Sequence, residues 1–276
     1  MKAELTLPKA LNPLAEAVAA NIDGILGVLA SSANRQRFAS CVVIAANQLK
    51  ADQTPISPAS VVVASLHAAV IGLVPGPSLR HCYFVPRKLR RSDPAAKCQL
   101  EIGYPGYLHL TYGCRHLKGI YCDWVLRGEE FAHGVSSARG GAFVEHSPSP
   151  DRDVTADSLR KSMVGAYCYW ETADGFRSHR YLTRKEIDMA EASGGPVWRG
   201  PYYGEMALKT TIVRAAKWWN LSEQLAMAVT LDQQFEAGEE QDIGAPPLQL
   251  AQTAPDFDLD AMKEDGDEGA EADTKG

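Results

Sequence analysis

The sequence predicts an α+β fold with a disordered acidic C-terminal tail. Residues 10–73 are rich in Ala, Leu and Val, as helices are, residues 80–181 carry strand signals, and residues 183–219 carry helix signals again. The tail, residues 236–276, has 13 acidic and 2 basic residues and no sustained hydrophobic period. Because 45% of the 276 residues are hydrophobic, the rest of the chain can bury a sizeable core. Fibrous and fully disordered classes are therefore excluded.

In the second half of the first helical region, the sequence marks both the start and the end of a helix. Ser57 supplies an N-cap and Pro58 stands at the first helical position, while Gly72 follows the apolar run. That run, Ala59–Val74, is interrupted by polar residues and is shorter than the roughly 18–20 apolar residues that cross a bilayer. We therefore expect a packed helix here and no membrane segment.

The composition of the N-terminus and the cysteine spacing predict a cytoplasmic protein. Glu16 and Asp23 lie where a secretory signal would be uncharged. No Cys-x-x-Cys pair occurs among the six cysteines, and the nearest approaches to a zinc half-site are His81-Cys82 and Cys114-Arg115-His116. We favour reduced structural thiols over zinc ligands, and we expect no metal or other cofactor.

The middle region predicts an antiparallel sheet with one short helix. An aromatic run turns at residues 173–175 within Ala166–Arg180, which predicts a hairpin. Lys118–Leu126 is a second strand, and Cys98–Ile102 is a strand that leads into a helix over Pro105–Tyr112. The Gly, Ser and Pro content of Gly134–Pro150 predicts a surface loop.

Two helices are predicted in the third region. Thr183 and Glu186 form a capping box, and the helix that they start ends at Gly194-Gly195. At 100° per residue, Tyr203–Trp219 gathers an apolar stripe of Leu208, Ile212, Ala215 and Trp219. The opposite half carries Lys209, Thr210, Val213, Arg214 and Lys217. Since no acidic residue lies among these cations to pair with them along the helix, we expect a positive face, with a merely solvated face as the alternative.

Charge is distributed unevenly along the chain. The net charge of −6 combines a tail of strong negative charge with a body, residues 1–235, that holds 21 acidic and 26 basic residues. Arg80–Lys118 alone has eight basic and two acidic residues with tyrosines between them, a mixture typical of nucleic-acid binding but also of a solvated loop. The tail is expected to serve solubility, to compete with a polyanion for the body, or to dock a partner.

Four segments, in order, resemble one known family. Val61–Arg87, Lys97–Leu110, Lys118–Phe131 and Glu205–Lys217 are similar to the corresponding segments of phage RecT-type single-strand annealing recombinases. The resemblance spans roughly residues 35–220. It implies an α+β fold in which a small antiparallel sheet and flanking helices form a basic groove. We accordingly divide the chain into a variable helical segment (1–34), an annealing core (35–235) and the acidic tail (236–276).

The resemblance also implies a function without a chemical active site. Such a protein coats single-stranded DNA as a homo-oligomer, a ring or a filament, and anneals complementary strands in homologous recombination without ATP. The implied partners are single-stranded DNA, the annealed duplex, further copies of the chain, and a phage exonuclease or a host single-strand-binding protein. No membrane is involved.

Matching the family's motifs residue by residue gives a set of expected DNA-binding positions. They are Arg87, Lys97, Gln99, Tyr104, Tyr107, Trp198, Lys209, Thr210, Arg214 and Lys217. The chain departs from the family pattern at Pro105, Leu208 and Val213, where relatives carry a basic residue, and Arg90, Arg91 or Arg115 can compensate. Replacing Lys209 or Arg214 by Ala is expected to weaken DNA binding and leave thermal stability nearly unchanged.

Catalytic motifs are missing from the sequence. No Gly-x-x-x-x-Gly-Lys-Ser/Thr loop, Gly-x-Ser-x-Gly elbow or deaminase zinc motif occurs. The alternative function is a metal-dependent DNA nuclease, which needs clustered carboxylates. The candidates match no ligand spacing and are better explained as solvated turn residues: Asp123, Glu129, Glu130, Glu145, Asp151 and Asp153.

Overall fold

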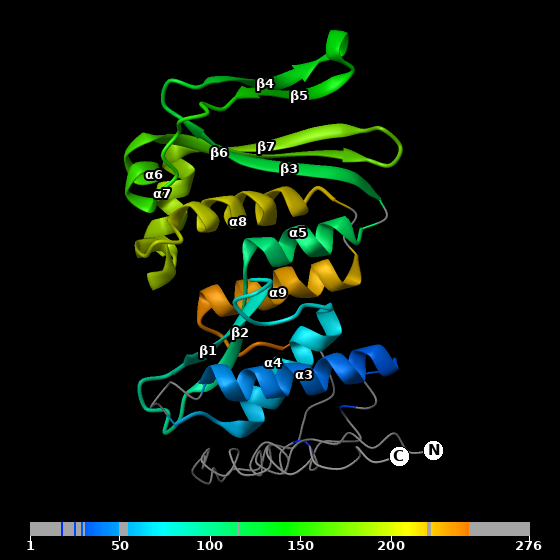
Figure 1. The fold of residues 1–276 in the computed structure, drawn as a ribbon, viewed down its shortest axis with the longest axis vertical. Helices are drawn as coiled ribbons and strands as arrows, with labels where there is room; N and C mark the ends of the chain where they lie inside the picture. The colour runs from blue at the N-terminus through cyan, green and yellow to red at the C-terminus, as the bar shows by residue number, and fades with distance from the viewer. Residues whose placement is uncertain are drawn as a thin grey trace, which may run out of the picture. The chain divides into compact units, whose positions relative to one another are not determined.

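The computed structural model describes residues 18, 25, 29, 31–49, 55–114, 116–219 and 222–242, and it confirms the mixed α+β class (Figure 1). The predicted variable segment up to residue 30, the compensating Arg115 and the acidic tail from residue 243 lie almost entirely outside these residues. The elements are α3 (Ser32–Leu49), α4 (Pro58–Ile71), β1 (Cys82–Arg87), β2 (Lys97–Ile102), α5 (Tyr104–Tyr112), β3 (Leu117–Leu126), β4 (Glu130–Ser136), the 3-10 turn η2 (Ser137–Arg139), β5 (Gly141–Ser147), α6 (Ala156–Ser162), β6 (Met163–Thr172), β7 (Arg177–Thr183), α7 (Arg184–Ser193), the 3-10 turn η3 (Pro196–Arg199), α8 (Tyr203–Ala216) and α9 (Glu223–Ala237).

The chain forms two compact units. Of the described residues, unit 1 contains those up to 69 and those of 84–99, and unit 2 contains those of 70–83 and 100–242. The helix α4 and the paired strands β1 and β2 each pass from one unit into the other. Each unit has its own buried side chains, so each is described separately.

Unit 1 is built on α3, most of α4, residues 84–87 of β1 and residues 97–99 of β2. The predicted start of α4 at Pro58 and its end before Gly72 are confirmed, and Gly72 has a positive φ of 84° that favours glycine. The backbone N–H of Cys98 donates to the hydroxyl of Ser60 at 2.8 Å, and that of Ala96 donates to the carbonyl of Pro55 at 2.7 Å. These bonds fix the start of β2 to the start of α4.

Unit 2 is layered around the antiparallel sheet β3-β6-β7. Cys168 of the central strand β6 lies opposite Cys122 of β3 and Arg180 of β7. The helix α8 covers one face of the sheet, the hairpin β4–β5 lies over the other, and α5 and α9 follow beyond α8 (Figure 1). The predicted hairpin of Ala166–Arg180 and the predicted strand at Lys118–Leu126 are both confirmed as parts of this sheet.

The hairpin β4–β5 corrects the expectation of a surface loop over Gly134–Pro150. Its ladder is continuous from the pair Glu130–Ser147 to the pair Ser136–Gly141. The glycines that suggested a loop instead form the turn: Gly140 and Gly141 have φ values of 74° and 128°, which other residues rarely adopt. The ring of Phe131 then packs on Tyr167 of the sheet, with centroids 5.5 Å apart. Glycine content marked the turn rather than an irregular segment.

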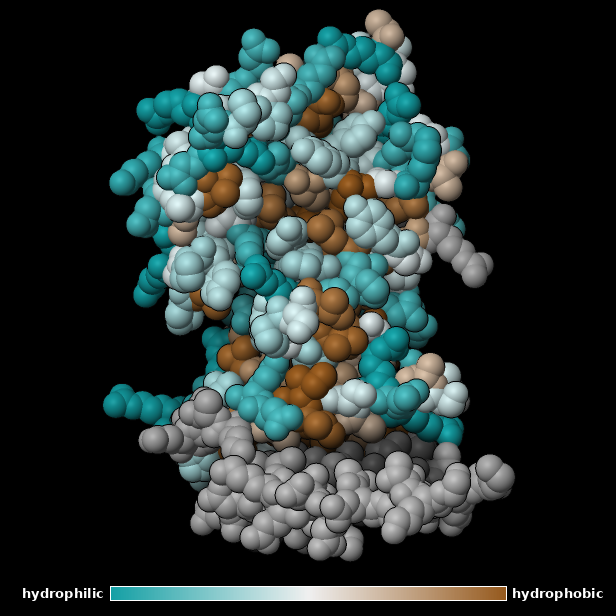
Figure 2. Space-filling view, in the orientation of Figure 1, coloured by the Kyte–Doolittle hydropathy of each residue, from teal (hydrophilic) through white to brown (hydrophobic). Residues whose placement is uncertain are grey.

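The helices of unit 2 begin and end largely as the sequence predicts. The capping box of Thr183 and Glu186 starts α7, and α5 follows β2 and ends before Gly113. The expected tail boundary at residue 236 falls inside α9, and the buried Gln241 beyond it accepts from the backbone N–H of Leu100 at 2.6 Å. The folded part therefore continues at least to residue 242. Figure 2 shows hydrophobic side chains in separate patches among hydrophilic ones on the face that it displays.

Two histidines join the hairpin to the sheet and make the contact sensitive to pH. Nδ1 of His133 and Nε2 of His179 lie 2.9 Å apart. Burial lowers the pKa of His133, and burial together with the neighbouring His133 lowers the pKa of His179. A folded state with a lowered histidine pKa binds fewer protons than the open state, so it is stable above the ordinary pKa of 6.5 and loses that stability as the pH falls.

We therefore expect the hydrogen-exchange protection factors of the β4 and β5 amides to fall between about pH 7.5 and pH 5, while those of β6 stay nearly constant. The variant His179→Gln, which cannot titrate, should lose most of this pH dependence. Equal protection of the hairpin at both pH values in the unmodified protein would contradict the prediction.

Candidate nucleic-acid interface

The helix α8 holds the centre of the candidate site. Its predicted apolar stripe of Leu208, Ile212, Ala215 and Trp219 is buried, as expected. Close approach to α6 and to the sheet is possible because position 204 is glycine: a Cβ there would lie 2.4 Å from Cδ1 of Leu159 on α6 and 3.0 Å from Cζ2 of Trp124 on β3. The indole nitrogen of Trp124 on β3 donates to the carbonyl of Gly204 at 2.8 Å. These contacts fix the helix rotation and hence which side chains it exposes.

The prediction that Lys209 lies on an exposed positive face is wrong. Lys209 is 3% exposed, and its Nζ lies 2.6 Å from Oδ1 of Asp232 on α9. Burial alone would lower the pKa of Lys209, but the adjacent Asp232 carboxylate, together with Glu101 and Glu236, outweighs it and the pKa is raised. Lys209 is therefore a charged residue of the core that ties α8 to α9. No local pattern in the sequence indicates its partner, which lies 23 residues further along the chain.

Three other expected DNA contacts are also buried. Gln99, Tyr107 and Trp198 are at most 2% exposed. The Tyr107 hydroxyl lies 3.4 Å from the carbonyl of Ala228, to which it donates. The Trp198 ring packs edge-on against Tyr203, with centroids 6.0 Å apart. In this conformation neither ring is accessible to a base, and Tyr104 at the start of α5 is half-buried.

Two glycines beside these tyrosines, Gly103 and Gly106, have a packing role. A Cβ on Gly103 would lie 2.4 Å from the carbonyl oxygen of Arg80, and one on Gly106 would lie 2.2 Å from that of His81. The segment before β1 thus crosses the start of α5 at a distance that only glycine allows.

The remaining expected residues are at least partly accessible. Arg87 and Lys97 are half-buried in unit 1, where Arg90 and Arg91 are exposed in the connection between β1 and β2. In unit 2, Thr210 is half-buried, Lys217 is exposed, and the Arg214 side chain is 34% exposed.

Two carboxylates of unit 2 each face two accessible cations. Glu186 lies 2.9 Å from Arg180 and 3.6 Å from Arg214. Glu171 is likewise shared, at 2.8 Å from Lys118 and 3.5 Å from Arg177. One carboxylate facing two cations leaves each cluster with net positive charge, which attracts phosphate. Sequence reasoning did not single out Arg177 and Arg180, because their strand alternates basic with polar residues and resembles an ordinary exposed strand.

Two of the nuclease candidates, Asp123 and Glu129, have structural partners. Asp123 receives two hydrogen bonds from Nη2 of Arg152, at 2.9 and 3.0 Å. Glu129 accepts from the backbone N–H of Leu126 and pairs with His146 at 3.0 Å. Burial would raise the pKa of Glu129, but these hydrogen bonds lower it overall. Among the described residues no group of three or more His, Cys, Asp or Glu side chains is placed to hold a metal, and no helix is long and apolar enough to cross a membrane.

The buried pair of α8 and α9 gives a direct test of the corrected role of Lys209. Lys209→Met should lower the free energy of unfolding by about 3–5 kcal/mol in chemical denaturation, because it leaves Asp232 buried without a counter-charge. The double variant K209M/D232L should recover most of this stability and retain binding to oligo(dT). Unchanged stability of K209M together with lost DNA binding would show instead that Lys209 contacts DNA.

Comparison with known proteins agrees with the resemblance seen in the motifs. The protein RecT of Escherichia coli (strain K12) is 26% identical over 178 residues, which are 63% of this chain and 62% of that protein. An uncharacterized protein, YqaK of Bacillus subtilis (strain 168), is 25% identical over 180 residues, which are 62% of this chain and 55% of that protein. The chain thus covers less than two thirds of the length of these relatives.

The RecT family model matches a single continuous stretch, residues 37–245. This stretch covers most of the described residues, from within α3 to the end of α9. The chain therefore belongs to the RecT family.

Proposed function

We propose that this protein binds single-stranded DNA and anneals complementary strands without ATP, as a cytoplasmic homo-oligomer acting in homologous recombination. The observation that carries the proposal is membership of the RecT family, since RecT-type proteins are annealing recombinases. The two accessible cations that share one carboxylate at α8 and β7 support a polyanionic ligand. Binding and annealing involve no covalent step, so no catalytic residue is proposed.

The proposed contacts are those expected residues that solvent can reach. In unit 2, Arg214 and Lys217 contact backbone phosphates, and Thr210 contributes a hydroxyl. In unit 1, Arg87 and Lys97 contact phosphates. Lys209 acts indirectly, because its ion pair holds the helix that carries Arg214 and Lys217. In unit 2, Thr210, Arg214 and Lys217 are proposed to line the basic groove.

Binding of the DNA backbone by these cations promotes annealing in two ways. Phosphates held by cations repel a second strand less, and an extended strand loses less conformational entropy when it pairs. The protein holds the backbone and leaves the Watson–Crick edges free, so base pairing alone selects the complementary strand. Further copies of the chain bind the next segments of the same DNA strand, which is why we propose a ring or a filament.

A nucleotide-free annealing assay tests the proposal. The protein should accelerate pairing of two complementary labelled oligonucleotides and leave both intact in the presence of Mg²⁺. The double variant R214A/K217A should slow annealing and weaken oligo(dT) binding, whereas the matched surface control K185A on α7 should behave as the unmodified protein. Failure of the unmodified protein to anneal would overturn the proposal, and degradation of the DNA would favour a nuclease.

The salt dependence of oligo(dT) binding measures the number of phosphates held. Four cations, Arg87, Lys97, Arg214 and Lys217, predict a slope of about −2.8 in log K against log salt, at about 0.7 per phosphate for single strands. The double variant R214A/K217A should reduce the slope to about −1.4. A slope near zero in a fluorescence titration of the unmodified protein would be incompatible with this grip.

The acidic tail is proposed to compete with DNA for the basic body, or to dock an exonuclease or a host single-strand-binding protein. Its removal is best made after Asp242, because Gln241 is buried and bonded to Leu100. Competition predicts tighter oligo(dT) binding by the truncated chain, with the largest gain at low salt, because its cations no longer exchange one polyanion for another. Docking predicts unchanged DNA affinity together with loss of partner capture.

A further inference from the structure

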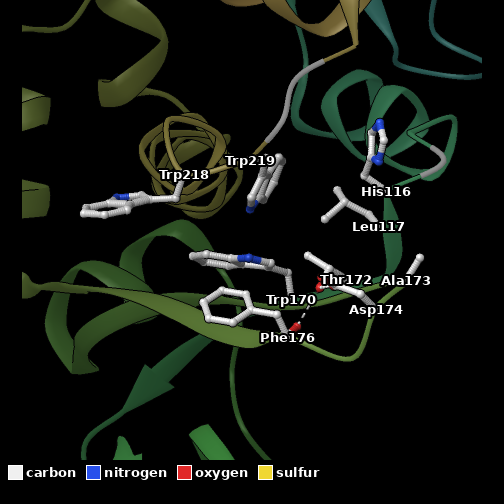
Figure 3. A pocket seen from close by; sticks show the side chains of 9 residues that line it. All are labelled: His116, Leu117, Trp170, Thr172, Ala173, Asp174, Phe176, Trp218 and Trp219. Carbon is white, nitrogen blue, oxygen red and sulfur yellow. Dashed lines mark hydrogen bonds between the residues drawn. The ribbon is translucent and has the colours of Figure 1, made fainter.

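An aromatic pocket lies where α8 ends beside the β6–β7 turn (Figure 3). Its volume is about 330 Å³, and three tryptophans and a phenylalanine line it together with His116 and Leu117 at the start of β3. Trp170 comes from β6, Phe176 from the turn that follows it, and Trp218 and Trp219 from the residues just after α8. All of these residues belong to unit 2, and none of the expected DNA contacts is among them.

The pocket combines a fixed floor with exposed walls. Trp170 and Trp219 are 2% and 8% exposed and pack edge-on, with centroids 5.8 Å apart at 72°. Trp218 and Phe176 are 77% and 61% exposed. The backbone of Trp218 and Trp219 is fixed to the end of α8, because their N–H groups donate to the carbonyl oxygens of Ala215 and Ala216. Two flat rings therefore face water beside a rigid aromatic surface.

One polar group in the pocket has no acceptor. The buried Nε1 of Trp219 donates to none of the described residues. In Figure 3 this nitrogen lies at the end of the indole that is turned toward Trp170. Since the two indoles pack edge-on, the N–H is directed at the Trp170 ring, a weak contact that helps to hold the floor of the pocket.

One cation adjoins the pocket. Lys217 is exposed and directly precedes Trp218. Lys118 and Arg177 belong to the other face of the sheet, because both contact Glu171, which alternates with the pocket residues Trp170 and Thr172 along β6. Asp174 on the turn is already bonded to the Thr172 hydroxyl. Exposed flat rings beside a cation form the combination that binds the bases and phosphates of single-stranded nucleic acid.

We propose that this pocket binds one unpaired nucleobase of single-stranded DNA. The base stacks on Trp218 or Phe176, and a neighbouring phosphate contacts Lys217. The volume is at the small end of small-molecule pockets and suits a single base rather than a run of stacked ones. The inference rests on the proposed DNA binding and adds to it a base-specific contact that the phosphate grip lacks.

Oligo(dT) and an abasic oligonucleotide of equal length separate base contacts from phosphate contacts. The unmodified protein should bind oligo(dT) more tightly than the abasic strand. Trp218→Ala should weaken oligo(dT) binding at least about five-fold, the lower end expected for one stacked base, and leave abasic binding nearly unchanged. Trp218→Phe should restore most of the affinity. Tyr112→Ala, which removes an exposed ring on α5 outside the pocket, is the matched control and should leave both affinities unchanged.

The outcomes distinguish this inference from the proposed function. If the unmodified protein binds both strands but W218A keeps the same preference for oligo(dT), the pocket does not hold a base, although DNA binding stands. A W218A variant that changes subunit number or partner capture without changing that preference likewise overturns the inference and assigns the pocket to protein contacts. If the unmodified protein binds neither strand, the proposed function itself fails.

Discussion

The packing of α8 between the sheet and α9 is the constraint on which the rest of unit 2 depends. Its apolar stripe is buried against β3, β6 and β7, while Lys209 on another side reaches the Asp232 carboxylate of α9 at 2.6 Å. A buried charge is tolerable only with a counter-charge, so this pair fixes the position of α9 as well as the rotation of α8. The last turn of α8 then places Arg214 and Lys217 toward solvent and Trp218 beside the sheet end.

This arrangement separates structural from accessible charge on a single helix. Lys209 and Arg214 are only five residues apart, yet one is locked in the core and the other shares Glu186 with Arg180 at the surface. Shared carboxylates hold the cationic side chains in place without neutralising them. A preorganised positive surface of this kind loses less side-chain entropy when phosphates bind than free lysines would lose.

Much of the fold could be predicted from the sequence, because its signals are local. The capping box at Thr183, the proline at the start of α4 and the alternation of Ala166–Arg180 each depend on neighbouring residues. The hairpin β4–β5 was missed because Gly140 and Gly141 suit both a loop and a tight turn, and only the packing of Phe131 on the sheet decides between them. The family motifs selected α8 for the proposed site, but the burial of Lys209, Tyr107 and Trp198 depends on α9 and the core, which helical periodicity cannot reveal. The doubled tryptophan at 218–219 was the one local sign of the aromatic pocket.

Lysine footprinting tests most directly where the strand lies. Acetylation of the unmodified protein, with and without saturating oligo(dT) and read by mass spectrometry, reports each lysine separately. The account predicts that oligo(dT) protects Lys97 and Lys217, leaves the exposed Lys185 and Lys161 reactive, and does not change Lys209, which stays unreactive because it is buried. Protection of Lys185 and Lys161 with continued reactivity of Lys97 and Lys217 would contradict it.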